Sequence, residues 1–123
     1  MSYAVYKLMH YLGIVVLITA LAATSMHVLR GGSRADNPYR RTLGITHGVA
    51  ALLILTGGFG MLARLGVMHG ALPNWIYAKL AIWVALAAAM MVPYRGQRYA
   101  RALLIVVPVL AAAAGAVALY KPF

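Results

Sequence analysis

The sequence predicts an all-α integral membrane protein, an up-down bundle of four transmembrane helices. Two observations predict this fold class. Hydrophobic residues make up 64% of the 123 residues and charged residues only 10%, whereas a soluble domain carries about a quarter of its residues as charged side chains. The apolar residues also fall into four long runs, and a helix needs roughly 20 apolar residues to cross a bilayer. We therefore expect a single transmembrane domain over residues 1–123.

The four spans follow from where the apolar runs stop. They are expected at about residues 3–29, 43–67, 75–92 and 100–120. A segment of glycine and arginine closes the first run, Gly70 and Pro73 close the second, and Pro93 closes the third. Glycine and proline punctuate helices in this way. Pro108 falls inside the fourth span and is expected to bend it. The first run has a long apolar core, so we expect an uncleaved helix rather than a signal peptide.

Basic residues are unequally divided between the two sides of the predicted bundle. The first and third loops hold Arg30, Arg34, Arg40, Arg41, Arg95, Arg98 and Arg101. The opposite side holds Lys7, Arg64, Lys79 and Lys121. Because basic residues mark the cytoplasmic side, we expect a multi-pass protein of the bacterial inner membrane with both termini in the periplasm. We also expect the loop arginines to contact the anionic lipid headgroups of the bilayer.

The composition excludes several classes of function. A formal charge of +10 would suggest nucleic-acid binding in a soluble protein, but no basic stripe is interleaved with exposed aromatic residues here. We therefore expect no nucleic-acid partner. Asp36 is the only acidic residue and cysteine is absent, which excludes paired-carboxylate catalysis, disulfides and thiolate metal sites. No phosphate-binding loop, His-x-x-x-His motif or nucleophile elbow is present. These absences favour a protein that is not an enzyme.

Small residues predict how the helices pack. Gly44 and Gly48 form a small-xxx-small pair, and further small residues follow at Gly57, Gly58, Gly60 and residues 111–115. Because lipid provides no hydrophobic drive between helices, close backbone approach at small residues is what holds a bundle together. We expect these positions to pack the four helices, although the same motifs would equally serve dimerisation.

Ionisable side chains inside the apolar runs are the best indication of function, because they are costly at membrane depth. In an up-down bundle the first and third helices start on the same side, which places His10 and Lys79 in one half. Lys7 is expected to be an interfacial anchor. His10 lies about two turns inside the first helix, so it either hydrogen-bonds a neighbouring helix or contacts a ligand.

Two further histidines, His27 and His47, lie at matching levels in the other half. One interpretation is a bis-histidine haem site, but that needs helix backbones well beyond the spacing of about 8–10 Å between adjacent packed helices. The favoured interpretation is a hydrogen-bonded histidine pair beside the headgroups. His69 is expected in a solvated turn.

Three short motifs resemble those of small four-helix membrane proteins. Residues 6–13 resemble the Lys-x-x-His-x-x-Gly opening of the SirB family and of the HemJ-type protoporphyrinogen oxidases, which bind haem b. Residues 75–80 resemble the Trp-x-x-x-Lys-Leu element of both groups. His47 and the residues after it resemble the SirB pattern, and the charged residues that HemJ-type proteins carry before the second helix are missing. The resemblance implies His10 and Lys79 as the shared functional pair, with His47 as a SirB-like addition.

These observations support two functional hypotheses. The favoured one is a non-enzymatic accessory or interaction subunit of a larger membrane complex, with a polar site around His10, Lys79 and His47. The alternative is a redox protein that binds haem b or a porphyrin, or an oxidoreductase that acts on a tetrapyrrole. In that alternative His10 is the axial ligand and Lys79 lies near a propionate or substrate carboxylate. Met61 lies at about the depth of His10 and could supply a sixth ligand, although a methionine in a membrane helix is far more often a packing residue.

Overall fold

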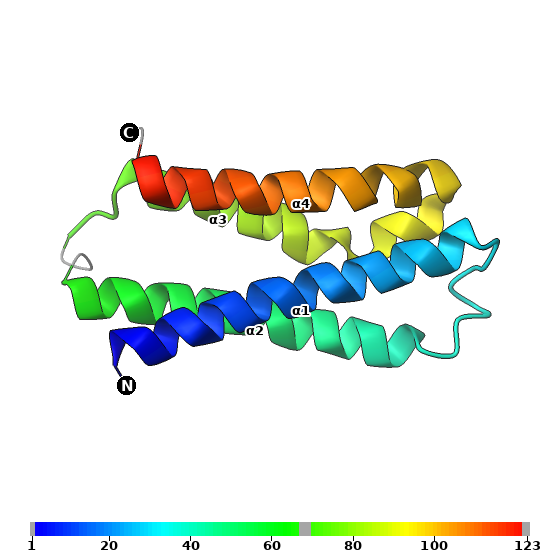
Figure 1. Ribbon diagram of the computed structural model, residues 1–123, viewed down its shortest axis with the longest axis horizontal. Helices are drawn as coiled ribbons and strands as arrows, with labels where there is room; N and C mark the ends of the chain where they lie inside the picture. Colours follow the sequence, from blue (N-terminus) through cyan, green and yellow to red (C-terminus); the bar gives the residue numbers. More distant parts are fainter. Residues whose placement is uncertain (1, 67–69, 122–123) are drawn as a thin grey trace.

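The computed structural model describes residues 2–66 and 70–121. Over these residues the helices are α1 (Tyr3–Leu29), α2 (Arg40–Leu65), α3 (Asn74–Ala88), the 3₁₀-helix η1 (Ala89–Arg95) and α4 (Gln97–Tyr120). They form four segments that are long and apolar enough to cross a membrane, with α3 and η1 together making the third. Figure 1 shows two antiparallel hairpins, α1–α2 and α3–α4, lying against each other as two layers. The predicted all-α, four-helix membrane bundle is confirmed.

Two of the helices begin earlier than the apolar runs predict. α2 begins at Arg40 and α4 at Gln97, each three residues before the expected start. Several arginines that were expected in loops therefore lie within helices, namely Arg40, Arg41, Arg98 and Arg101, and Arg95 lies in η1. Arginine is a good helix former, and its long side chain reaches the interface from the first turn of a helix. These arginines still lie at the predicted end of the bundle. The expected end of the second span, at residue 67, lies outside the described residues.

The third span is not one regular α-helix. α3 ends at Ala88 and continues as the seven-residue η1, which contains Pro93. Because proline has no N–H, it cannot donate to the carbonyl four residues before it, and the chain tightens into a 3₁₀-helix there. The carbonyl of Leu86, at the junction, accepts hydrogen bonds from the backbone N–H of Ala89 and from the ring of His47. His47 therefore caps the end of α3.

The most extensive helix contact joins α1 to α2, and glycines allow it. A Cβ placed on Gly57 would lie 2.6 Å from the backbone nitrogen of His10 and 2.6 Å from the carbonyl oxygen of Tyr6. A Cβ on Gly13 would lie 2.8 Å from the carbonyl oxygen of Ala50. Any side chain at these two positions would push the backbones apart, so the separation of α1 and α2 depends on glycine.

The glycine pair that was expected to pack the bundle does not do so. A Cβ on Gly44 or Gly48 would meet nothing within 4 Å, and the same is true of Gly115. The prediction that these residues hold the helices together is wrong, because a small residue permits a close contact without specifying which face of the helix makes it. Whether Gly44 and Gly48 serve dimerisation stays a prediction.

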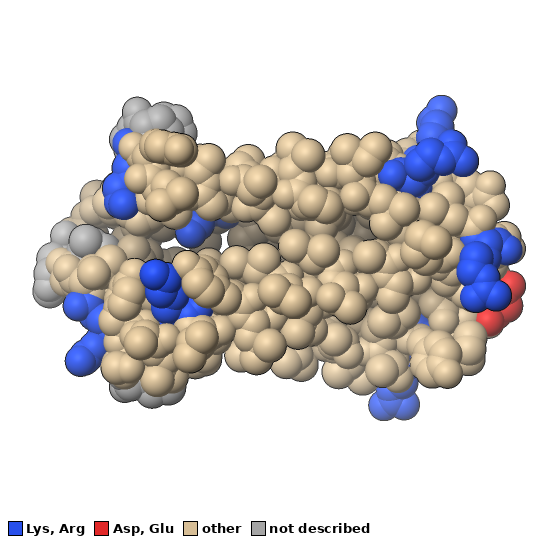
Figure 2. Space-filling model, in the orientation of Figure 1, with Lys and Arg blue, Asp and Glu red and all other residues tan. Residues whose placement is uncertain are grey.

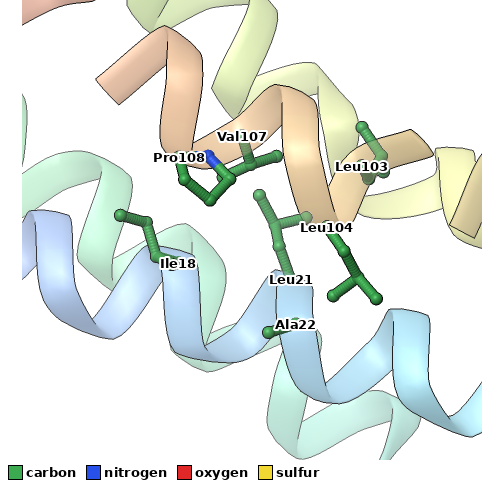
Figure 3. A pocket seen from close by; sticks show the side chains of 7 residues that line it. All are labelled: Ile18, Leu21, Ala22, Leu103, Leu104, Val107 and Pro108. Atoms are coloured by element: carbon green, nitrogen blue, oxygen red, sulfur yellow. The ribbon is translucent and has the colours of Figure 1, made fainter. Parts of the chain in front are cut away.

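The apolar core joins both hairpins. Its buried members come from every helical span and are Leu17, Leu21, Ala50, Ala51, Leu86, Ala89 and Val107. α4 contacts α1 along this core and continues through Pro108 without interruption. Figure 3 shows the ring of Pro108 facing Ile18 and Leu21 of α1, where a small cavity separates the two helices. The core and the contact between α1 and α4 are thus filled mainly by aliphatic side chains.

We expect Gly57→Ala to destabilise the protein and Gly48→Ala to leave it as stable as the wild type or slightly more so. Both variants replace a glycine inside α2 and gain roughly 1 kcal/mol of helix propensity, so their difference reports the contact with α1. At Gly57 the added methyl clashes with backbone, and overpacking of this kind costs about 1–3 kcal/mol. Unfolding free energies from titration with a denaturing detergent in mixed micelles measure both. Equal stabilities would contradict the close contact.

Candidate functional site between the two hairpins

The central residue of the candidate site is His10, which is only 8% exposed. Its Nδ1 lies 2.8 Å from the carbonyl oxygen of Ile54 on α2. A carbonyl oxygen can only accept, so Nδ1 carries the proton and donates it. In the neutral ring the other nitrogen, Nε2, then has a free lone pair. Of the two roles expected for this histidine, the hydrogen bond to a neighbouring helix is observed, and it leaves the second nitrogen available for a ligand.

Two hydrogen bonds fix the register of α3 against α2. They join Trp83 Nε1 to the oxygen of Ala51 at 3.0 Å, and His47 Nε2 to the oxygen of Leu86 at 3.1 Å. α2 and α3 run antiparallel. Lys79, one helical turn before Trp83 on α3, is therefore level with Ile54, one helical turn after Ala51 on α2. The structure therefore places Lys79 at the level of the carbonyl that binds His10.

Lys79 is half-buried on α3, and no hydrogen bond or ion pair with another described residue holds its ammonium group. Lys121, which follows α4, has its Nζ 5.1 Å from the ring centroid of Trp75, one helical turn before Lys79 on α3. An amine at this depth in lipid is costly unless something offsets its charge. Within the described part of the chain, Lys79 is thus a half-buried charged group without a hydrogen-bond partner, and the buried hydroxyl of Ser25 also has none.

The two hairpins separate toward the end that carries both termini (Figure 1). α1 packs on α2 and α3 packs on α4, whereas α2 and α3 touch each other little. Figure 2 shows a hollow between the two layers at this end, with basic side-chain atoms beside it. His10 and Lys79 belong to this half of the bundle, as the topology predicts. We call the space between the two layers at this end, in the half that holds His10 and Lys79, the interhairpin cleft.

His47 lies outside the interhairpin cleft. It is seven residues before Ile54, roughly 10 Å along the axis of α2, and its Nε2 is used by the carbonyl of Leu86. The structure thus places two of the three predicted site residues, His10 and Lys79, at one level of the same half of the bundle, and it gives His47 a role in ending α3. The neutral ring of His47 donates from Nε2, which leaves Nδ1 without a proton.

His27 and His47 do not form the expected hydrogen-bonded pair. The Nε2 of His27 lies 2.8 Å from Oδ1 of Asp36 and 2.9 Å from the oxygen of Ser33, both in the loop after α1. The prediction is wrong because it matched the levels of the two histidines along the bundle, whereas their side chains leave different faces. The backbone N–H of Ser33 and the ring of His27 both donate to Asp36, and they hold the pKa of this carboxyl below its ordinary value.

Lys7, near the start of α1, lies on the surface of the bundle. Lys7 is exposed, and its Nζ lies 5.9 Å and 5.7 Å from the ring centroids of Tyr3 and Tyr11. These are cation–π distances, and they agree with the expected role of an anchor. His69 lies outside the described residues.

Two participants in this region were missed by the sequence analysis. Trp83 was counted only as an apolar residue, although an indole N–H in the middle of a membrane helix needs an acceptor and so indicates a helix–helix contact. Lys121 was counted only among the basic residues on the side opposite the arginine-rich loops. Its nearness to Lys79 depends on how α4 packs beside α3, which no local pattern reports.

The fold and the site together define a multi-pass helical membrane protein with an imidazole and an ammonium group at one level between its two hairpins. No protein-family model, no curated protein and no solved structure matches this chain. The resemblance to the SirB family therefore stays a prediction.

Proposed function

We propose that the protein binds haem b in the interhairpin cleft, with His10 as axial ligand to the iron. The observation that supports the proposal is the hydrogen bond from Nδ1 of His10 to the carbonyl of Ile54. Histidines that bind metals usually donate their second ring N–H to a carbonyl or carboxylate, which fixes the tautomer and makes the ligating nitrogen more basic. His10 already has this arrangement: its Nδ1–H donates to the carbonyl of Ile54, and its Nε2 is left with a free lone pair.

A metalloporphyrin suits the donor set better than a bare metal ion does. Among the described residues, no three histidine, aspartate or glutamate side chains lie close enough to hold an ion. A porphyrin brings its own four nitrogen ligands, so one protein imidazole is sufficient. Its ring is apolar and its propionates are anionic, which matches aliphatic helix faces and the ammonium of Lys79. When bound, the group supplies electron-transfer or redox chemistry, while His10 holds the iron and Lys79 neutralises a carboxylate.

A second candidate function is a non-enzymatic accessory subunit of a larger membrane complex, of the SirB kind. The observation that favours it is the open outer face of α2 around Gly44 and Gly48, where an added Cβ would meet nothing within 4 Å. A helix of another subunit can approach such a face closely, because no side chain stands between the backbones. The two functions are compatible, since the face and the interhairpin cleft are separate.

We also propose that the protein lies in the bacterial inner membrane with both termini in the periplasm. The end of the bundle away from the termini carries seven arginines, and the end with the termini carries Lys7, Arg64, Lys79 and Lys121. Figure 2 shows basic side chains at both ends. The excess at the arginine-rich end favours its retention in the cytoplasm.

The haem proposal predicts a Soret band in the protein purified in mild detergent, or after addition of haemin to the purified protein. His10→Gln should remove the band while keeping an N–H donor for Ile54, so the bundle still folds. His47→Ala is the matched control: it should keep the band and lose about 1–3 kcal/mol of stability, because the carbonyl of Leu86 loses a donor. A wild type that retains no Soret band once free haemin has been removed by gel filtration, or an unchanged band in His10→Gln, would contradict the proposal.

The accessory proposal predicts that gentle extraction yields the protein in a larger complex on native gels. Gly48→Ile should release it from that complex without unfolding it, because the position faces open space. A wild-type protein that migrates alone, or a Gly48→Ile variant that stays in the complex, would count against this function.

The proposed orientation can be measured by labelling, because the chain has no cysteine. Ser2→Cys should react with a membrane-impermeant maleimide in intact spheroplasts. Ala35→Cys, in the arginine-rich loop, should react only after lysis. The reverse pattern would overturn the orientation.

A further inference from the structure

Two lysines lie beside the same stretch of α3, at the end of the bundle where the interhairpin cleft opens. Lys121 directly follows α4, and its Nζ lies 5.1 Å from the ring centroid of Trp75 at the start of α3. Lys79 is one helical turn further along α3, on the same stripe as Trp75. Lys121, the C-cap residue of α4, thus brings a second positive charge to the part of α3 that carries Lys79.

No side chain of this protein can neutralise the two charges. Asp36 is the only acidic residue, and it is bonded to His27 at the opposite end of the bundle. Figure 2 shows the acidic side chain at the arginine-rich end, opposite the end with the hollow. Repulsion between like charges is weak in water but grows several-fold in the low-dielectric surroundings of a membrane protein. A bound anion would be attracted by both ammonium groups and would offset the repulsion between them.

The two lysines differ in how far the protein itself accommodates them. Lys121 donates to the carbonyl oxygen of Ala118 at 2.9 Å and lies over the Trp75 ring. Lys79 is half-buried and has no such bond to a described residue. One ammonium is therefore held in place by its surroundings, while the other has its hydrogen-bonding capacity left for a ligand in the cleft.

We propose that Lys79 and Lys121 form a binding site for the oxyanion head of an amphipathic molecule whose apolar part lies in the interhairpin cleft. The head is a carboxylate or a phosphate, and Trp75 forms an apolar wall beside it. The ligand is amphipathic because the lysines lie at the mouth of a space lined by membrane helices. The inference shares Lys79 with the haem proposal, but it does not depend on iron ligation by His10.

Iron-free protoporphyrin IX is the first probe, because it carries two carboxylates and needs no axial ligand. Its fluorescence reports binding to the full chain in nanodiscs of phosphatidylcholine. Lys79→Gln and Lys121→Gln should each weaken binding about tenfold, the effect expected from losing one charge-assisted hydrogen bond. The dimethyl ester of the same porphyrin should bind more weakly to the wild type, and neither variant should weaken it further. Lys7→Gln is the matched control, a basic residue at the same end of the bundle, and should leave binding unchanged.

Phosphatidylglycerol is the second probe and distinguishes the two sources of an oxyanion. If the natural ligand is a phospholipid, native mass spectra should show phosphatidylglycerol retained by the wild type and by Lys7→Gln, and about tenfold less by either site variant. Loss of either probe in both site variants supports the site and identifies the class of head group. Wild-type binding of both probes in Lys79→Gln and Lys121→Gln, or an equal loss in Lys7→Gln, would overturn it.

Circular dichroism and the elution volume in detergent establish that each variant is folded. The haem and oxyanion proposals are separated by His10→Gln, which should lose the Soret band with haemin and keep its affinity for the iron-free porphyrin. If that variant keeps the Soret band, axial ligation fails and the oxyanion site stands on its own measurement.

Discussion

The close approach of α1 and α2 is the constraint on which the rest of the structure depends. Gly57 lies directly against the backbone of His10, so the two helices touch where the candidate site begins. At this separation a short histidine side chain can reach the carbonyl of Ile54 on the neighbouring helix. A wider spacing would leave the imidazole without an acceptor, and its tautomer would no longer be fixed. Packing between glycines therefore determines the chemistry of a ring nitrogen.

A chain with one carboxylate has to tie its helices together without ion pairs. It uses backbone carbonyls instead, each of which has a second lone pair beyond the one used within its helix. Side-chain donors reach such carbonyls on neighbouring helices in the pairs His10–Ile54, Trp83–Ala51, His47–Leu86 and Gln97–Val28. Bonds of this kind in a membrane contribute about 0.6–2 kcal/mol each. They specify the register of the bundle, and they leave the charge of Lys79 uncompensated.

The spans and the shared half of His10 and Lys79 could be predicted from the sequence, because apolar length and alternating direction determine both. Contacts that depend on helix rotation could not be predicted. His27 and His47 occupy matching levels but leave different faces, and one binds a loop while the other caps α3. The glycines divide in the same way, since Gly57 packs and Gly48 does not. Rotation about a helix axis is set by all the neighbours together, which a local pattern does not contain.

The 3₁₀-helix at the end of the third span changes how far that span reaches. α3 and η1 contain 15 and 7 residues, whereas α4 contains 24. As a continuous α-helix the third span would be about 33 Å long, some 3 Å shorter than α4 at about 36 Å. A 3₁₀-helix rises about 2.0 Å per residue, so η1 brings the third span to about 37 Å. The proline that disrupts the α-helix thus makes the span with the fewest residues about as long as α4.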